Sequence, residues 1–74
     1  MFGISAGYLK SIKDRFPKGA RVECIHCADI YHPIESGEKG TVNYVDDIGT
    51  IHINWDNGRT LGICLEEDSI KRID

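Results

Sequence analysis

The spacing of apolar residues near the start of the chain is helical. Apolar side chains recur there at intervals of three and four residues, which places them along one side of a helix. These side chains belong to Tyr8, Leu9, Ile12 and Phe16. The pattern predicts a helix over residues 4–16.

The residues at the two ends of this segment suit a helix. Ser5 can cap the first turn, because a short hydroxyl side chain accepts a hydrogen bond from an otherwise unpaired amide. Pro17 and Gly19 end the helix, since the residue before a proline is pushed out of the helical conformation. A helix of about twelve residues is marginally stable alone, so we expect it to pack against the rest of the chain.

After Gly19 the spacing changes to the alternation of apolar and polar residues that is typical of strands. Five segments of strand length follow, divided by turn-forming residues: 20–26, 40–45, 50–55, 60–65 and 69–73. Side chains two residues apart are expected to share a face in three of them: Val22, Cys24 and His26; Val42 and Tyr44; and Ile51, Ile53 and Trp55.

Short strands in series without a second helix are typical of small antiparallel barrels. We therefore predict a mainly β fold, a small five-stranded antiparallel SH3-like barrel preceded by one N-terminal α-helix. Residues 1–74 are expected to form a single domain, with the helix over residues 4–16 and the barrel over residues 20–73.

Two hairpin turns and one long loop are indicated between these strands. In Asp56-Asn57-Gly58, Asn and Gly both tolerate the positive φ angles of a tight hairpin. Asp46-Asp47-Ile48-Gly49 is expected to form the preceding hairpin in the same way. The segment "CADIYHPIESGEKG" over residues 27–40 has too little periodicity for a strand, and such loops often carry binding residues.

Composition and charge narrow the functional class. The chain has 74 residues, of which 41% are hydrophobic, and it contains no apolar run of the roughly 18 residues that span a membrane. Its first residues lack the pattern of a secretory signal, so we expect a cytoplasmic protein without membrane contact. The formal net charge is −3, with an excess of positive charge confined to residues 1–18. An acidic body argues against sequence-independent binding of phosphates, which needs clustered Lys and Arg.

The residues that could carry metal or redox chemistry are better explained as structural. Cys24 and Cys27 have the spacing of a zinc knuckle or a redox pair, but no second pair accompanies them. On a strand they would point to opposite faces, so we interpret them, with Cys64, as small apolar residues of the core. The carboxylates lie on separate turns without the spacing of a calcium-binding loop. We expect no metal and no cofactor.

Catalysis is not expected either. No serine, cysteine or threonine has an obvious base beside it, and so small a core leaves little room for a pocket that excludes water. The sequence therefore predicts a protein that is not an enzyme.

Trp55 has two interpretations. Alternation places it with Ile51 and Ile53, so it is expected to cover one end of the core, with an indole edge that reaches the surface because its N–H needs a partner. There Tyr31 and His32 from the long loop could join it in a shallow aromatic groove. The simpler interpretation, which we favour, is a buried aromatic followed by a tight turn.

Most of the chain resembles a bacterial family known as domain of unknown function 4314. The likeness is carried by Gly40-Thr41-Val42, Asp46-Asp47-Ile48-Gly49 and Trp55-Asp56-Asn57-Gly58, and by "FPKGARVECI" and "EDSIKRI". The resemblance implies an accessory protein of a phage or mobile element, without an established activity. More remotely, "GARV", "GEKGTV" and "INWDNG" look like the small barrel modules of Mind bomb and HERC ubiquitin ligases, which bind peptides.

The function that we predict is that of a non-catalytic protein- or peptide-interaction module. The expected binding residues are Tyr31, His32, Pro33, Trp55, Asp56 and Arg59. The aromatic residues would supply contact area, Asp56 would pair with a basic group of the partner, and Arg59 would pair with an acidic one. Two alternatives stay open: a nucleic-acid-binding KOW-like barrel that uses the basic residues Lys10, Lys13 and Lys18, and an oligomeric sponge that sequesters a small molecule or a nucleotide signal.

Overall fold

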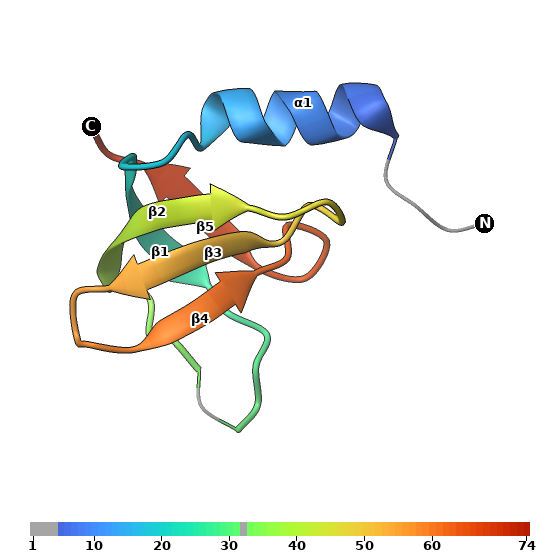
Figure 1. The fold of residues 1–74 in the computed structure, drawn as a ribbon. Helices are drawn as coiled ribbons and strands as arrows, with labels where there is room; N and C mark the ends of the chain where they lie inside the picture. Colours follow the sequence, from blue (N-terminus) through green and yellow to red (C-terminus); the bar gives the residue numbers. More distant parts are fainter. Residues whose placement is uncertain (1–4, 32) are drawn as a thin grey trace.

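A computed structural model describes residues 5–31 and 33–74 and shows one helix lying over a curved β-sheet (Figure 1). The helix α1 spans Ala6–Arg15. Ser5 is its N-cap, and its Oγ accepts a hydrogen bond of 3.2 Å from the amide of Tyr8. Phe16 is the C-cap, directly before Pro17. The predicted helix and its capping residue are confirmed; residue 4, where the prediction began, lies outside the described residues.

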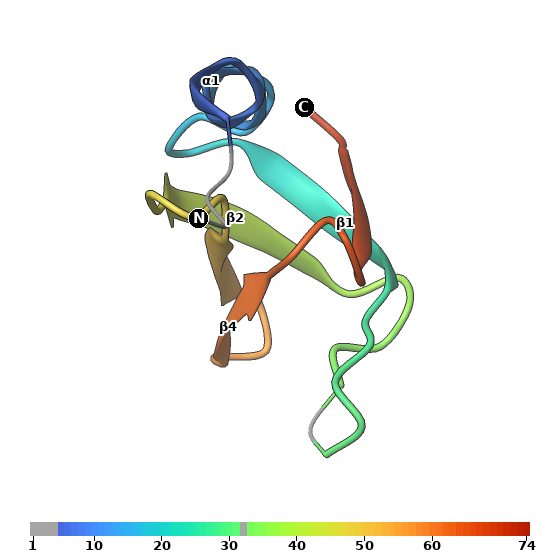
Figure 2. The ribbon, with the colours of Figure 1, turned by 90° about the vertical axis from the view of Figure 1, so that its right-hand side faces the viewer.

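Fewer side chains of the helical segment are buried against the sheet than the apolar spacing predicted. Ile12 and Phe16 are buried, Leu9 is half-buried, and Tyr8 is exposed. The helix lies over β2 at one end of the molecule (Figures 1 and 2). With ten residues, α1 is neither long nor apolar enough to cross a membrane, and no other helix occurs in residues 5–31 and 33–74.

The five predicted strands are all present. They are β1 (Arg21–His26), β2 (Lys39–Val45), β3 (Ile51–Trp55), β4 (Thr60–Ile63) and β5 (Ser69–Arg72). Their order across the sheet is β4-β3-β2-β1-β5, and every neighbouring pair is antiparallel. The first four strands thus form a meander, and β5 returns to pair with β1.

The sheet curves strongly, as Figure 2 shows, but it is open. The strands β4 and β5 are its two edges, and no ladder joins them in the described part of the chain. The mainly β, five-stranded antiparallel class with an N-terminal helix is therefore confirmed, while closure of the curved sheet into a barrel stays a prediction.

Two β-bulges change the faces to which the alternation had assigned side chains. In β1, Cys24 pairs with Ile70 and His26 with Ser69, so Ile25 is an extra residue. A bulge of one residue turns every side chain after it to the other face. The prediction that His26 shares the face of Cys24 is wrong for this reason: Cys24 is buried and His26 is exposed.

The second bulge lies in β2. Val42 pairs with Ile53, but Tyr44 pairs with His52, so Asn43 is the extra residue of this ladder. The prediction that Tyr44 shares the buried face of Val42 is therefore also wrong. Tyr44 instead stands on the outer face of the sheet, beside His52, and is 51% exposed.

The core fills the concave side of the sheet and the space below α1. Alternation in β3 is confirmed, since Ile51, Ile53 and Trp55 are all buried. The buried residues come from the helix, from all five strands and from the segments that flank them: Ile12, Phe16, Ala20, Val22, Cys24, Ile34, Val42, Ile51, Ile53, Trp55, Ile63 and Ile70.

Both predicted hairpins share one geometry. The amide of Gly58 bonds to the carbonyl of Trp55 and the amide of Gly49 to that of Asp46, at 3.0 Å in each case. Gly58 and Gly49 have φ angles of 91° and 88°, which fits a three-residue loop that ends in a left-handed residue. No residue other than glycine has a positive φ in the described part of the chain, so in the β3–β4 hairpin the positive φ falls on Gly58 and not on Asn57.

Candidate functional site

Trp55 is a core residue and not part of a surface groove. Its side chain is only 3% exposed, and its Nε1 donates a hydrogen bond of 3.2 Å to the carbonyl oxygen of Leu61. The partner that the indole N–H requires is thus found inside the sheet. The expectation that the indole edge reaches the surface is wrong, and the interpretation as a buried aromatic followed by a turn is confirmed.

The loop between β1 and β2 projects away from the body at the end opposite to α1 (Figures 1 and 2). Ile30 and Tyr31 are 84% and 80% exposed, and Pro33 is exposed beside them. We call these three residues the loop tip. The predicted binding residues Tyr31 and Pro33 therefore lie together at the surface, while His32 lies outside the described residues.

Hydrogen bonds fix the loop on both sides of its tip. On one side, the amide of Ala28 donates to Asp68 Oδ1 at 2.7 Å. On the other side, a guanidinium N–H of Arg59 donates to the carbonyl oxygen of Pro33 at 3.0 Å, and Ile34 is buried in the core. Arg59, for which we predicted contact with an acidic partner, thus holds the loop in place.

Asp56 is also engaged within the chain. Its two carboxylate oxygens accept hydrogen bonds of 2.7 and 2.6 Å from the guanidinium of Arg21. This bidentate pairing holds the pKa of Asp56 below its ordinary value. Asp56 was expected to pair with a basic group of a partner. In the structure it pairs with Arg21 of β1 instead.

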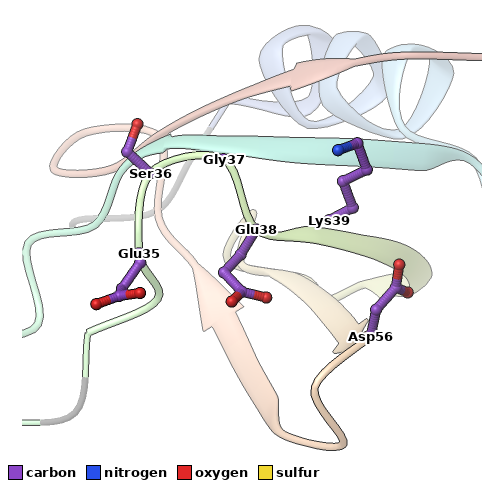
Figure 3. A pocket seen from close by; sticks show the side chains of 6 residues that line it. All are labelled: Glu35, Ser36, Gly37, Glu38, Lys39 and Asp56. Carbon is purple, nitrogen blue, oxygen red and sulfur yellow. The ribbon is translucent and has the colours of Figure 1, made fainter.

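Asp56 borders an open hollow of about 410 Å³. The other residues of this hollow are Glu35, Ser36, Gly37, Glu38 and Lys39 (Figure 3). In Figure 3 the three carboxylates are spread along the hollow and do not converge on one point. Within residues 5–31 and 33–74, no three His, Cys, Asp or Glu side chains gather closely enough to hold a metal ion.

The three cysteines have free thiols. Cys24 is fully buried, its Sγ lies 3.6 Å from the carbonyl oxygen of Ile34, and burial raises the pKa of its thiol. Cys27 is partly buried and packs against the core. A raised pKa keeps a thiol protonated and unreactive, which agrees with the interpretation of Cys24 as a core residue.

The outer face of the sheet carries a cluster of Tyr44, His52 and Asp46 that the alternation of apolar and polar residues did not predict. The rings of Tyr44 and His52 are stacked, with centroids 4.3 Å apart and planes 9° apart. His52 Nε2 lies 2.8 Å from Asp46 Oδ2. Because an ionised carboxylate only accepts hydrogen bonds, the ring carries a proton on Nε2. The bulge at Asn43 brings Tyr44 beside His52, and a bulge is not visible in the alternation of one strand.

Asp46 gives the protein an expected dependence of stability on pH. His52 and the backbone amides of Thr50 and Ile48 hold the pKa of Asp46 below its ordinary value of 3.8. Because the pKa of Asp46 is lower in the folded state than in the unfolded state, the ionised carboxylate stabilises the fold above pH 3.8. This stabilisation is lost as the pH falls below that value. Asp46→Asn is therefore expected to make the acid-induced loss of stability shallower.

The measurement is the urea midpoint of unfolding at a series of pH values from 6 down to about 2. Asn keeps an oxygen that accepts the two amide hydrogen bonds, and it removes the charge together with the oxygen that accepts from His52. Asp47→Asn removes a neighbouring exposed carboxylate and is the control. If both variants follow the wild-type pH profile, Asp46 makes no such contribution.

Together, these features define the chain as a small mainly β domain with a projecting loop that has an apolar tip. In its described residues no set of metal ligands is gathered. Residues 5–73 match the family described as domain of unknown function DUF4314. The chain therefore belongs to this family, as its turn motifs indicated. No curated protein and no solved structure gives a significant match.

Proposed function

We propose that this protein is a non-catalytic interaction module that binds another protein through the loop tip. The observation that carries the proposal is the exposure of two adjacent large apolar side chains, Ile30 and Tyr31, at 84% and 80%. Single exposed apolar residues are normal on protein surfaces, but here two are adjacent in the chain and share a projecting loop with the exposed Pro33. Contiguous exposed apolar surface is typical of interaction sites.

The attachment of the loop also supports the proposal. The contacts of Ala28 with Asp68 and of Pro33 with Arg59 hold the two sides of the tip, and Ile34 anchors it in the core. A contact surface that is ordered before binding loses less conformational entropy when the complex forms. Tyrosine suits such a surface, because aromatic residues supply much contact area with few rotatable bonds.

The partner that fits this tip is a protein with an apolar pocket that receives Ile30 and Tyr31. Burying an isoleucine side chain contributes about 1.5–3 kcal/mol, which is enough for these two residues to dominate a small interface. We place this module in a phage or mobile element as an accessory protein, which directs the search toward a protein of a bacterial host.

The test is a pull-down from bacterial lysate followed by titration of the recovered partner. Ile30→Ser/Tyr31→Ser is expected to lower affinity at least tenfold, because it removes the apolar area without touching the hydrogen bonds that hold the loop. Ile48→Ser is the matched control, since Ile48 is 75% exposed on a different turn. A folded double variant that binds the same partner with wild-type affinity would overturn the proposal.

A further inference from the structure

A second surface, at the opposite end of the molecule from the loop tip, has a different chemistry. A depression of about 230 Å³ lies between the C-terminal end of α1 and the second half of β2. Lys13, Pro17 and Lys18 line it on the side of the helix, and Asn43 and Tyr44 line it on the side of the sheet. None of its lining residues is acidic, although the protein as a whole has an excess of negative charge.

The aromatic ring of this depression is held in place before any ligand arrives. His52 stacks on Tyr44 and is itself bonded to Asp46. Half of the Tyr44 side chain nevertheless stays exposed. His52 covers one face of the ring, and the exposed part of Tyr44 is the surface on which we place a planar ligand.

The two lysines of the depression are available to an anion. In the described residues, Lys10 pairs with Asp14, and Lys39 and Lys71 both lie 4.0 Å from Glu23. No ion pair is formed there by Lys13 or Lys18. The C-terminal end of a helix is itself unfavourable for anions, so these positive charges are needed to make the site attractive to one.

We propose that this depression binds a nucleotide unit, a nucleobase together with its phosphate. The base would stack on Tyr44, the phosphate would lie between the ammonium groups of Lys13 and Lys18, and the Asn43 amide, which has both donors and an acceptor, would meet the edge of the base. Stacking on an aromatic ring beside a basic groove is the general chemistry of single-strand recognition.

The neighbouring surface extends the site along the outer face of the sheet. A second depression of about 300 Å³ shares Asn43 and Tyr44 with the first and continues past His52 to Asn54 and Thr60. It adds polar side chains and no carboxylate to the lining. A nucleotide unit could therefore come from a free mononucleotide or from a single strand that follows this surface. The proposal is independent of the interaction at the loop tip.

The experiment measures binding of a fluorescein-labelled single-stranded ten-nucleotide RNA to the intact protein by anisotropy, at several salt concentrations. The wild type is expected to bind at low salt, and log K should fall with log salt with a slope of about −0.7 for the one phosphate held between Lys13 and Lys18. Lys13→Gln/Lys18→Gln should remove most of this slope, while Lys39→Gln/Lys71→Gln should leave it unchanged.

The aromatic part of the site is tested separately. Tyr44→Leu is expected to weaken binding roughly tenfold without a change in the salt slope, because it removes the stacking surface and no charge. Tyr44→Phe keeps the ring and should bind like the wild type, which separates stacking from any loss of folding. Tyr8→Leu is the matched control, because Tyr8 is also a half-exposed tyrosine but lies on α1, outside the depression.

Titration with AMP, followed by the NMR shifts of Tyr44 and His52, identifies the source of the nucleotide. Saturable shifts of these rings with AMP would indicate that the ligand is a free nucleotide. Binding of the RNA without any shift by AMP would indicate that the ligand is a single strand. The proposal is overturned if neither AMP nor RNA binds at low salt, or if the control variants lose as much affinity as the site variants.

Discussion

Trp55→Ala is expected to leave the protein largely unfolded at room temperature. The indole is almost completely buried, and removing a buried aromatic side chain costs about 3–5 kcal/mol. The single hydrophobic core of so short a chain rarely supplies more than about 3–5 kcal/mol of stability, so most of it would be lost. The measurement is urea unfolding followed by circular dichroism, because the substitution removes the only tryptophan.

Trp55→Phe separates the volume of the ring from its hydrogen bond. Phenylalanine fills most of the space but leaves the carbonyl oxygen of Leu61 without the indole N–H. We expect a smaller loss, about 1–2 kcal/mol. Ile48→Ala, at an exposed position, should change the stability by no more than about 0.5 kcal/mol. If Trp55→Ala cost as little as Ile48→Ala, the indole would not belong to the core.

Gly40→Ala is expected to destabilise the protein by about 1–3 kcal/mol or more, through a steric clash in the centre of the sheet. A Cβ atom at this position would lie 2.6 Å from Cγ2 of Ile53, 3.0 Å from the backbone oxygen of Asn54 and 3.0 Å from Cε3 of Trp55. The backbone of Asn54 cannot move aside easily, because β3 is paired on both sides. Thermal unfolding measures the effect as a lower Tm, by about 4–8 °C for each kcal/mol.

Gly7→Ala is the matched substitution in the helix. No heavy atom lies within 4 Å of a Cβ placed there, and alanine has the higher helix propensity, by about 1 kcal/mol. The two changes add the same methyl group and are expected to shift Tm in opposite directions. A fall in Tm for Gly7→Ala, or no fall for Gly40→Ala, would contradict the packing described here.

Local patterns predicted most of the fold because its elements are determined by neighbouring residues. Ser5 and Pro17 mark the ends of the helix, and the alternation of Ile51, Ile53 and Trp55 identifies the buried face of β3. The two bulges and the open edges could not be predicted in this way. A bulge depends on the register between two strands, and the sequence of a single strand does not contain that register.

The same distinction applies to the binding residues. The exposure of Tyr31 and Pro33 follows from their place in a long loop between strands, which the sequence indicates directly. The burial of Trp55 and the pairing of Asp56 with Arg21 depend on contacts between residues far apart in the chain. Tyr44 became part of a candidate site only because the bulge at Asn43 turned it outward.

The return of β5 to the side of β1 has a consequence for the rate of folding. The part of the meander from β2 to β4 grows from two hairpins between neighbouring strands, and hairpins form within about 1–10 μs. The β1–β5 ladder instead joins Val22 to Arg72, about 50 residues apart, and it completes the core with Ile70. Closing so long a segment has an entropic cost that is met before its contacts form, so docking of the last strand should limit the speed at which the native state is reached.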